Sequence, residues 1–184
     1  SPVPVASADA SMPFATLPAG THSITAVYSG DSNFTGATSA PISQVVNKAT
    51  PGVGGFAPIT IASSLNPSIY QNAVTLTATA PAGSSGTITF MDASTALGTS
   101  PLVGTSATFS VSTLVAGTHP ITAVYSGDSN FSGATSTGIS QVVNKAPTVE
   151  SVFATPPTGV AVGSSVTFTT LVNTGALLPT GSVT

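Results

Sequence analysis

The chain contains no cysteine and no tryptophan among its 184 residues, and only 4% of its residues are charged. Without cysteine there are no disulfide bonds, no thiol nucleophile and no thiolate metal site, but the compartment stays open because many extracellular β-domains rely on core packing alone. Globular proteins average about 25% charged residues. Two lysines cannot supply the clustered positive charge that nucleic-acid binding requires, so we expect no nucleic-acid partner.

Long apolar runs are also missing. No stretch approaches the ~18 consecutive apolar residues of a membrane span, so we expect no insertion into a membrane. Ser1 does not begin the charged and then apolar pattern of a signal peptide, so we expect the sequence to be a mature piece or a fragment. The net charge of -3 gives weak repulsion between molecules, and we expect assembly or glycosylation to compensate for it.

The most prominent feature that is present is an internal repeat. LPAGTHSITAVYSGDSNFTGATSAPISQVVNKA, from Leu17, recurs as LVAGTHPITAVYSGDSNFSGATSTGISQVVNKA, from Leu114, at an offset of about 97 residues. This offset is the length of one immunoglobulin-sized domain. A unit so long, made of many short strands, predicts separate sandwiches in series, because a solenoid needs a shorter repeat.

Alternation of apolar and polar residues with a period of two predicts the strands of one complete domain, roughly residues 51 to 146. We expect residues 59–64 to form its first strand. Two pairs of proline and glycine, Pro81 with Gly83 and Gly98 with Pro101, are expected in turns. The residues predicted to face the core are Val74, Leu76 and Ala78, then Ile88 and Phe90, then Ala107, Phe109 and Val111, and finally Ile121, Ala123 and Tyr125.

The segment GTHxITAVYSGDSNF with a Val-rich strand after it, and VTLTATAPAGSSGTITF upstream, resembles the bacterial immunoglobulin-like domain repeats of group 3. The resemblance covers the central domain and both flanks. It implies an immunoglobulin-like fold and a role as a spacer or adhesive repeat of large secreted or surface proteins. Asp92 and Ala93 replace the Asp-Gly turn usual in that family, so the geometry of this turn is open. The turn residues marked by the resemblance in the two copies are Tyr28, Gly30, Asp31 and Asn33, and Tyr125, Gly127, Asp128 and Asn130.

Each end of the sequence contains half of a repeat. Residues 1–49 correspond to a second half, residues 50–146 to a complete repeat and residues 147–184 to a first half. In repeat register, about eight residues separate the end of one chain from the start of the next. The predicted fold class is therefore all-β: tandem immunoglobulin-like β-sandwiches, with one complete central domain flanked by two complementary half-domains.

A half-sandwich of under ~50 residues buries too little surface to stand alone and presents open strand edges. Two interpretations stay open. The sequence is a window of a longer array, or the last half of one molecule pairs with the first half of another, as in strand complementation. The second interpretation predicts an open head-to-tail filament.

The two histidines, His22 and His119, take equivalent places in the repeated Gly-Thr-His segment. A metal site or a base and nucleophile would need further ligands or partners, and each repeat has a single histidine with no Glu or Cys nearby. We therefore predict a partly exposed histidine at a strand edge. We expect no catalytic residue, no metal site and no cofactor.

The loop after each Tyr-Ser-Gly segment is rich in oxygen atoms: Asp31, Ser32 and Asn33 in the first copy, Asp128, Ser129 and Asn130 in the second. Weak Ca²⁺ binding is one interpretation. We favour ordinary turn residues that bond their own backbone, because calcium takes about six to eight oxygen ligands. Asn33 and Asn130 also begin N-glycosylation sequons, so both are candidate glycan sites and glycans are candidate partners.

These observations predict a structural protein and not an enzyme. We expect an extracellular or cell-surface fibre of immunoglobulin-like repeats, assembled head to tail from copies of this chain, with half-domains completed between neighbours. The alternative is a spacer or stalk segment of a large bacterial surface adhesin whose binding tip is absent here. The linkers at residues 48–51 and 145–147 contain proline and are expected to stiffen the rod.

Overall fold

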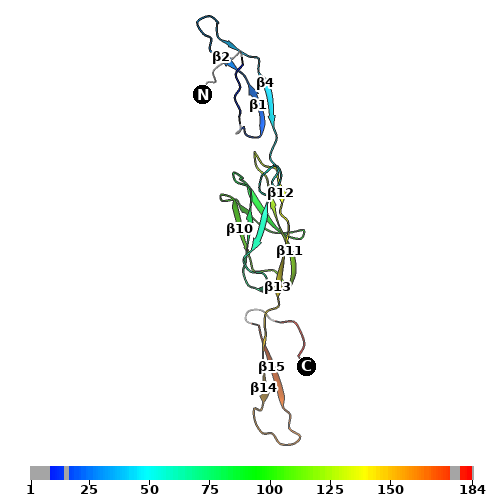
Figure 1. Cartoon of the computed structure of the whole chain (residues 1–184). Helices are drawn as coiled ribbons and strands as arrows, with labels where there is room; N and C mark the ends of the chain where they lie inside the picture. The colour runs from blue at the N-terminus through cyan, green and yellow to red at the C-terminus, as the bar shows by residue number, and fades with distance from the viewer. Residues whose placement is uncertain (1–8, 15–16, 175–178, 184) are drawn as a thin grey trace.

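The computed structural model describes residues 9–14, 17–174 and 179–183; Ser1 and Thr184, at the limits of the predicted half-domains, lie outside them. Every regular element of the described part is a β-strand. Nor does that part hold any helix of the length and hydropathy that spanning a bilayer requires. The strands form three groups in series along one axis (Figure 1). We name them the N-terminal unit (described residues up to 49), the central sandwich (59–144) and the C-terminal unit (described residues from 147).

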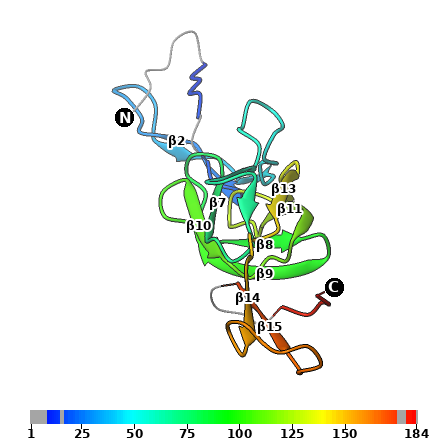
Figure 2. The same ribbon diagram turned by 90° about the horizontal axis from the view of Figure 1, so that it is seen from below.

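The central sandwich has two sheets, which lie on opposite sides of it when the molecule is viewed along its length (Figure 2). One sheet has the strand order β10-β7-β5, with β10 at Ser106–Val111, β7 at Val74–Thr79 and β5 at Thr60–Ser63. The other has the order β6-β13-β11-β8-β9, and β12 also pairs with β11. Its strands are β6 (Ser68–Ile69), β13 (Ile139–Asn144), β11 (Gly117–Tyr125), β8 (Thr87–Asp92), β9 (Thr95–Pro101) and β12 (Ala134–Thr135).

The core lies between these two sheets, where the period-two alternation places it. In β7, three buried side chains alternate with threonines that are exposed or half-buried, and β8 repeats the pattern. Ten of the eleven residues predicted to face the core are buried; Phe109 is half-buried. Apolar side chains from both sheets are therefore buried against one another, and this removal of apolar surface from water is the dominant stabilisation of a sandwich.

Gly98 and Pro101 do not form a turn; both lie within β9, so that prediction was wrong. Gly98 is paired with Phe90 at a register shift that leaves Leu97 as an extra residue. A Cβ atom on Gly98 would lie 2.3 Å from Cε2 of Phe109, whose ring stacks on Phe90 with centroids 5.8 Å apart. The glycine is therefore in the strand because an aromatic ring packs against its backbone.

The turn from β8 to β9 keeps a tight hairpin despite the missing glycine. Asp92 pairs with Thr95, so Ala93 and Ser94 form the tip. Ala93 has a φ of 50°, in the left-handed region that glycine adopts without strain. Its N–H donates to the carbonyl oxygen of Pro120 at 2.9 Å, which holds the turn against β11.

The N-terminal and C-terminal units contain only two-stranded sheets within the described residues. In the N-terminal unit, β1 (Gly20–Ile24) pairs with β4 (Ile42–Val46), and β2 (Val27–Tyr28) pairs with β3 (Ala37–Thr38). In the C-terminal unit, β14 (Val149–Thr155) pairs with β15 (Thr167–Asn173). β1 and β4 repeat the register of β11 with β13: Gly20 faces Val46 as Gly117 faces Val143. Their division into complementary half-domains stays a prediction.

The close approach of Phe109 to Gly98 predicts the effect of one added methyl group. Gly98→Ala should lower the free energy of unfolding of the central sandwich by about 1–3 kcal/mol, because the ring must leave its stacked position on Phe90. Gly159→Ala is the matched control, since a Cβ there meets no heavy atom within 4 Å. Urea denaturation followed by circular dichroism measures both. Equal stability of the two variants would contradict the packing argument.

Candidate functional site

The Tyr-Ser-Gly-Asp segment of the central sandwich forms a loop organised by one carboxylate. Oδ1 of Asp128 accepts the backbone N–H groups of Asn130 and Phe131, both at 2.8 Å. Oδ2 accepts the backbone N–H of Ser85 at 2.7 Å and its hydroxyl at 3.2 Å. Asp128 therefore ties its own loop to the turn before β8, which lies 43 residues earlier in the chain.

Tyr125 completes this network from the end of β11. Its side chain is buried, and its hydroxyl lies 2.8 Å from the carbonyl oxygen of Ser85 and 2.9 Å from Oδ2 of Asp128. Burial raises the pKa of Tyr125, and the hydrogen bond to Asp128 raises it further. Burial alone would disfavour the charged carboxylate of Asp128, but the N–H donors of Ser85, Phe131 and Asn130 outweigh it and hold the pKa of Asp128 well below its ordinary value.

Gly127 is required by the geometry of this loop. Its φ is 75°, and a Cβ there would lie 2.7 Å from the backbone nitrogen of Gly133. Gly30, its counterpart in the N-terminal unit, has a φ of 83° and the same 2.7 Å conflict with Gly36. The loop must bring two backbone segments into contact, and only glycine permits that.

The loop of the N-terminal unit has the same local hydrogen bonds without a sandwich around it. Oδ1 of Asp31 accepts the N–H groups of Asn33 at 2.7 Å and Phe34 at 2.9 Å, and the hydroxyl of Tyr28 donates to Oδ2 at 2.6 Å. The Tyr28 hydrogen bond, with these two N–H donors, lowers the pKa of Asp31. All four of these residues are exposed or half-buried. The conformation is therefore local to the sequence, whereas its burial depends on the surroundings.

The loop of the central sandwich also binds the N-terminal unit and the linker that follows it. The backbone N–H of Ala49 donates to the carbonyl oxygen of Asn130 at 2.8 Å, and Ser132 returns a 2.9 Å bond to Ala49. Nζ of Lys48 donates to the carbonyl oxygen of Asp128 at 2.6 Å. Oδ1 of Asn130 accepts the backbone N–H of Ala19 at 3.0 Å. We call these four contacts the junction clamp.

Apolar contacts reinforce the junction clamp. Ala49 forms an isolated parallel bridge with Phe131, and the ring of Phe56 meets the ring of Phe131 edge to face, with centroids 5.4 Å apart. Phe131 is buried as a result, at 6% exposed. The sequence predicted a linker stiffened by proline. The structure shows in addition that residues 48 and 49 are hydrogen-bonded to the next domain.

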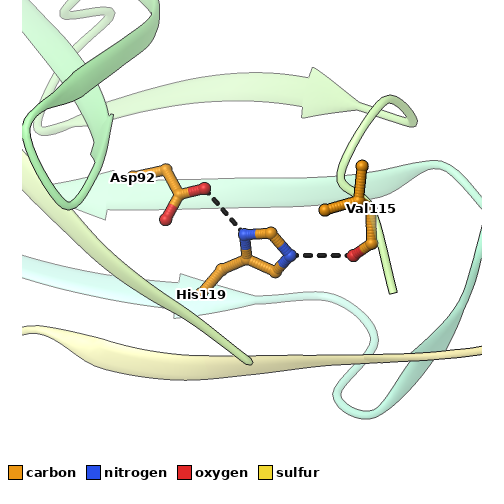
Figure 3. Close-up of polar contacts among 3 residues, drawn as sticks. All are labelled: Asp92, Val115 and His119. Carbon is orange, nitrogen blue, oxygen red and sulfur yellow. Dashed lines mark hydrogen bonds and ion pairs between the residues drawn. The ribbon is translucent and has the colours of Figure 1, made fainter. Parts of the chain in front are cut away.

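His119 lies in a second polar cluster of the central sandwich (Figure 3). Its Nδ1–H donates to Oδ2 of Asp92 at 2.7 Å, and its Nε2–H donates to the carbonyl oxygen of Val115 at 2.8 Å. Both partners are acceptors, so both ring nitrogens carry protons only in the imidazolium form. Burial opposes this form, but the Val115 carbonyl and the Asp92 carboxylate outweigh it and raise the pKa of His119.

This arrangement leaves His119 without a free nitrogen to act as a general base, because both are engaged by acceptors. It is buried in β11, so the expected partly exposed edge position was wrong for this residue. The physical reason is the hairpin from β8, which brings Asp92 beside it across 27 residues of sequence. No local sequence signal marks this pair, because placing Asp92 beside His119 requires the order of strands β8 and β11.

His22, the counterpart in the N-terminal unit, is half-buried and keeps only part of this arrangement. Its Nε2 lies 2.8 Å from the carbonyl oxygen of Pro18, as Nε2 of His119 lies near Val115. The 97-residue offset places the counterpart of Asp92 before Ser1. Among the described residues, both histidines bond a backbone carbonyl oxygen, and only His119 also bonds a carboxylate.

The remaining predicted sites are the two glycosylation sequons and the oxygen-rich loops that were considered for Ca²⁺. Asn33 is exposed, and Asn130 is half-buried with Oδ1 engaged in the junction clamp, so the two sequons differ in accessibility. Among the described residues, no three His, Cys, Asp or Glu side chains gather as they would around a metal ion. The oxygen atoms of Asp128 that could approach a cation already accept N–H and O–H donors.

The network around Asp128 predicts a difference between the two copies of the loop. Asp128→Ala should lower the free energy of unfolding of the central sandwich by about 1–3 kcal/mol, because the part-buried N–H groups of Asn130 and Phe131 lose a charged acceptor. Asp31→Ala removes the same carboxylate from the N-terminal unit and should leave the central transition unchanged. Urea unfolding followed by circular dichroism measures both. An equal loss in both variants would rule out the link to Ser85 as the source.

The Asp92–His119 pair predicts a pH-dependent contribution to stability. Because the pKa of His119 in the folded protein lies above its ordinary value of 6.5, the contribution is fully present below about pH 6.5 and is lost as the pH rises through the folded pKa. The difference in unfolding free energy between the wild type and Asp92→Asn should therefore be larger in mildly acidic than in alkaline buffer. Asp9→Asn, which removes a charge outside the central sandwich, should show no such trend.

The sequence model of the bacterial Ig-like domain (group 3) matches residues 1–47 and 60–144, which is more than half of the chain. The matched residues include both copies of the loop and all strands of the central sandwich, from β5 to β13. No curated protein matches the chain. Domains of this family are typically non-catalytic and commonly occur in surface proteins. The chain therefore belongs to the group 3 family of bacterial immunoglobulin-like domains.

Proposed function

We propose that this protein is a non-catalytic extracellular structural protein, the subunit of a fibre of immunoglobulin-like repeats. In this fibre the C-terminal unit of one copy and the N-terminal unit of the next complete one sandwich. The observation that carries the proposal is the exposure, in both units, of residues whose counterparts form the core of the central sandwich.

The N-terminal unit exposes one side of a sandwich core. Ile24 is 37% exposed, whereas its counterpart Ile121 is fully buried. Ile42 is likewise exposed, although its counterpart Ile139 packs against the core of the central sandwich. Burying such side chains is worth roughly 1.5–3 kcal/mol each, so an uncovered face strongly favours association.

The C-terminal unit exposes the opposite side. The residues VTFTTL from Val166 align with VTLTAT from Val74, so β15 corresponds to β7. Phe168 is 71% exposed, whereas its counterpart Leu76 is fully buried. β7 lies between β5 and β10 in its sheet, whereas β15 has β14 as its partner within the described residues. Around Phe168, the edge of β15 opposite β14 has no paired strand within the described residues, so this part of the edge can take a strand that corresponds to β10.

The N-terminal unit contains the segment that corresponds to β10 in the sequence, although this segment is not in a strand within the structure. Residues 10–14 are the counterparts of residues 107–111 in β10, and Met12 and Phe14 are exposed there. In the central sandwich, Phe109 faces Leu76 in the antiparallel register of β10 with β7. The same register places Met12 of one copy opposite Phe168 of another. The two units therefore offer complementary apolar faces, and residues 10–14 would have to become a strand on pairing with β15.

A spacer or stalk segment of a large surface adhesin is the second candidate function. The junction clamp favours it equally, because a bonded junction stiffens a rod whether the neighbouring repeats belong to another copy or to the same longer chain. In that case the exposed faces would be covered by neighbouring repeats of one polypeptide. The self-association of this chain separates the two candidates.

Self-association and cross-linking of the purified 184-residue chain test the fibre proposal. We expect sedimentation to show assemblies that grow with concentration and electron microscopy to show beaded filaments. Because the chain has no natural cysteine, Met12→Cys in one protein and Phe168→Cys in another should form a mixed disulfide dimer on mild oxidation. Val152→Cys, on β14, replaces Phe168→Cys as the control and should not cross-link. A chain that stays monomeric at all concentrations would leave the stalk as the better candidate.

A further inference from the structure

A cleft of about 360 Å³ lies at the junction between the central sandwich and the C-terminal unit. Its walls come from the loop before β11, from the linker after β13 and from the C-terminal unit. The first two contribute Val115, Ala116, Lys145, Ala146 and Pro147. Tyr70, Gln71, Thr174, Pro179 and Thr180 complete the lining.

The same surface exists at the first junction, where it is filled. At the 97-residue offset, Ala116 corresponds to Ala19, Lys145 to Lys48 and Ala146 to Ala49. These three counterparts are the residues of the N-terminal unit and its linker that form the junction clamp. What they hold is the loop at residues 128–132 of the following domain.

A second copy of the filling loop is available on the N-terminal unit. Residues 30–34 repeat the sequence Gly-Asp-Ser-Asn-Phe of residues 127–131, and Asp31 makes the same backbone hydrogen bonds as Asp128. The loop is already in the conformation that the clamp binds. It is nevertheless uncovered, since Asp31, Asn33 and Phe34 are all exposed.

We infer that the cleft at the second junction is a receptor for the loop at residues 31–34 of a second copy of this chain. Ala116 N–H donates to Oδ1 of Asn33, and Ala146 N–H donates to the carbonyl oxygen of Asn33. Nζ of Lys145 donates to the carbonyl oxygen of Asp31. The inference rests on the proposed head-to-tail function and adds to it a second contact, separate from the strand pairing of Met12 with Phe168.

One feature of the first junction has no counterpart at the second. Phe56, which covers Phe131, lies in a 13-residue connection between β4 and β5, whereas β13 and β14 are joined by residues 145–148 alone. The edge-to-face ring contact is therefore missing from the contact between copies. We expect that contact to be reversible and weaker than the junction clamp within one chain.

Cysteine pairs in the full chain test this contact directly. Ala116→Cys in one protein and Asn33→Cys in another should give a mixed disulfide dimer when the two are oxidised together, and no heterodimer when either is mixed with wild type. Ala19→Cys with Asn130→Cys in one chain is the matched control, because it closes the equivalent contact within the molecule, where Ala19 N and Asn130 Oδ1 are 3.0 Å apart.

A second variant keeps the test independent of disulfide geometry. Asn33→Ala removes the acceptor for Ala116 N–H and should raise the concentration at which the chain self-associates about three- to tenfold in sedimentation experiments. Asn47→Ala, which alters another exposed asparagine of the N-terminal unit, should leave that concentration unchanged.

The outcomes separate this inference from the proposed function. If Met12→Cys and Phe168→Cys join neighbouring copies while Ala116→Cys and Asn33→Cys do not, and Asn33→Ala associates like wild type, the cleft has another role and the fibre stands. If neither pair joins and the chain is monomeric, both proposals fail. A foreign peptide or small molecule that occupies the cleft while copies assemble would also overturn the assigned occupant.

Discussion

The apolar face of each β-sheet in this chain has to be covered by a second layer, and the rest of the structure depends on whether that layer is present. In the central sandwich, β10-β7-β5 covers the sheet that contains β11, and the side chains of Leu76 and Ile121 are fully buried between them. Within the residues that the structure describes, the N-terminal unit repeats β11 and β13 without the covering sheet, and the C-terminal unit contains the counterpart of β7 without the opposing sheet. The same residue types are therefore core in one place and surface in another.

The loop at residues 125–131 is hydrogen-bonded both to the central sandwich and to the linker that precedes it. Asp128 organises the loop from within, Ser85 ties it to the sandwich, and its outer carbonyl groups bind the preceding linker. A displacement of the linker must therefore break hydrogen bonds to a loop that is itself anchored in the core. This coupling supports a structural role, because a rod of sandwiches transmits force only as well as its junctions resist bending.

The strands of the central sandwich and the faces they present were predictable from period-two alternation, because residues in a half-buried strand alternate between core and solvent. Gly98 was misplaced in a turn, because the reason for a glycine within β9 is the ring of Phe109 on a different strand. His119 was placed at an exposed edge, because its carboxylate partner Asp92 is brought beside it only by the order of strands β8 and β11. Both errors concern contacts between residues distant in sequence.

The sequence by itself determined the all-β class, the repeat and its length, and the conformation of the Tyr-Ser-Gly-Asp loop, which is the same in both copies. These features depend on backbone preferences and on hydrogen bonds between residues a few positions apart. Only the tertiary structure decided the burial of Phe131 and the exposure of Phe34, the ion pair of His119 and the bonding of the first linker to the next domain. Identical local sequences diverge here because burial and long-range hydrogen bonds depend on which other strands and linkers lie beside them.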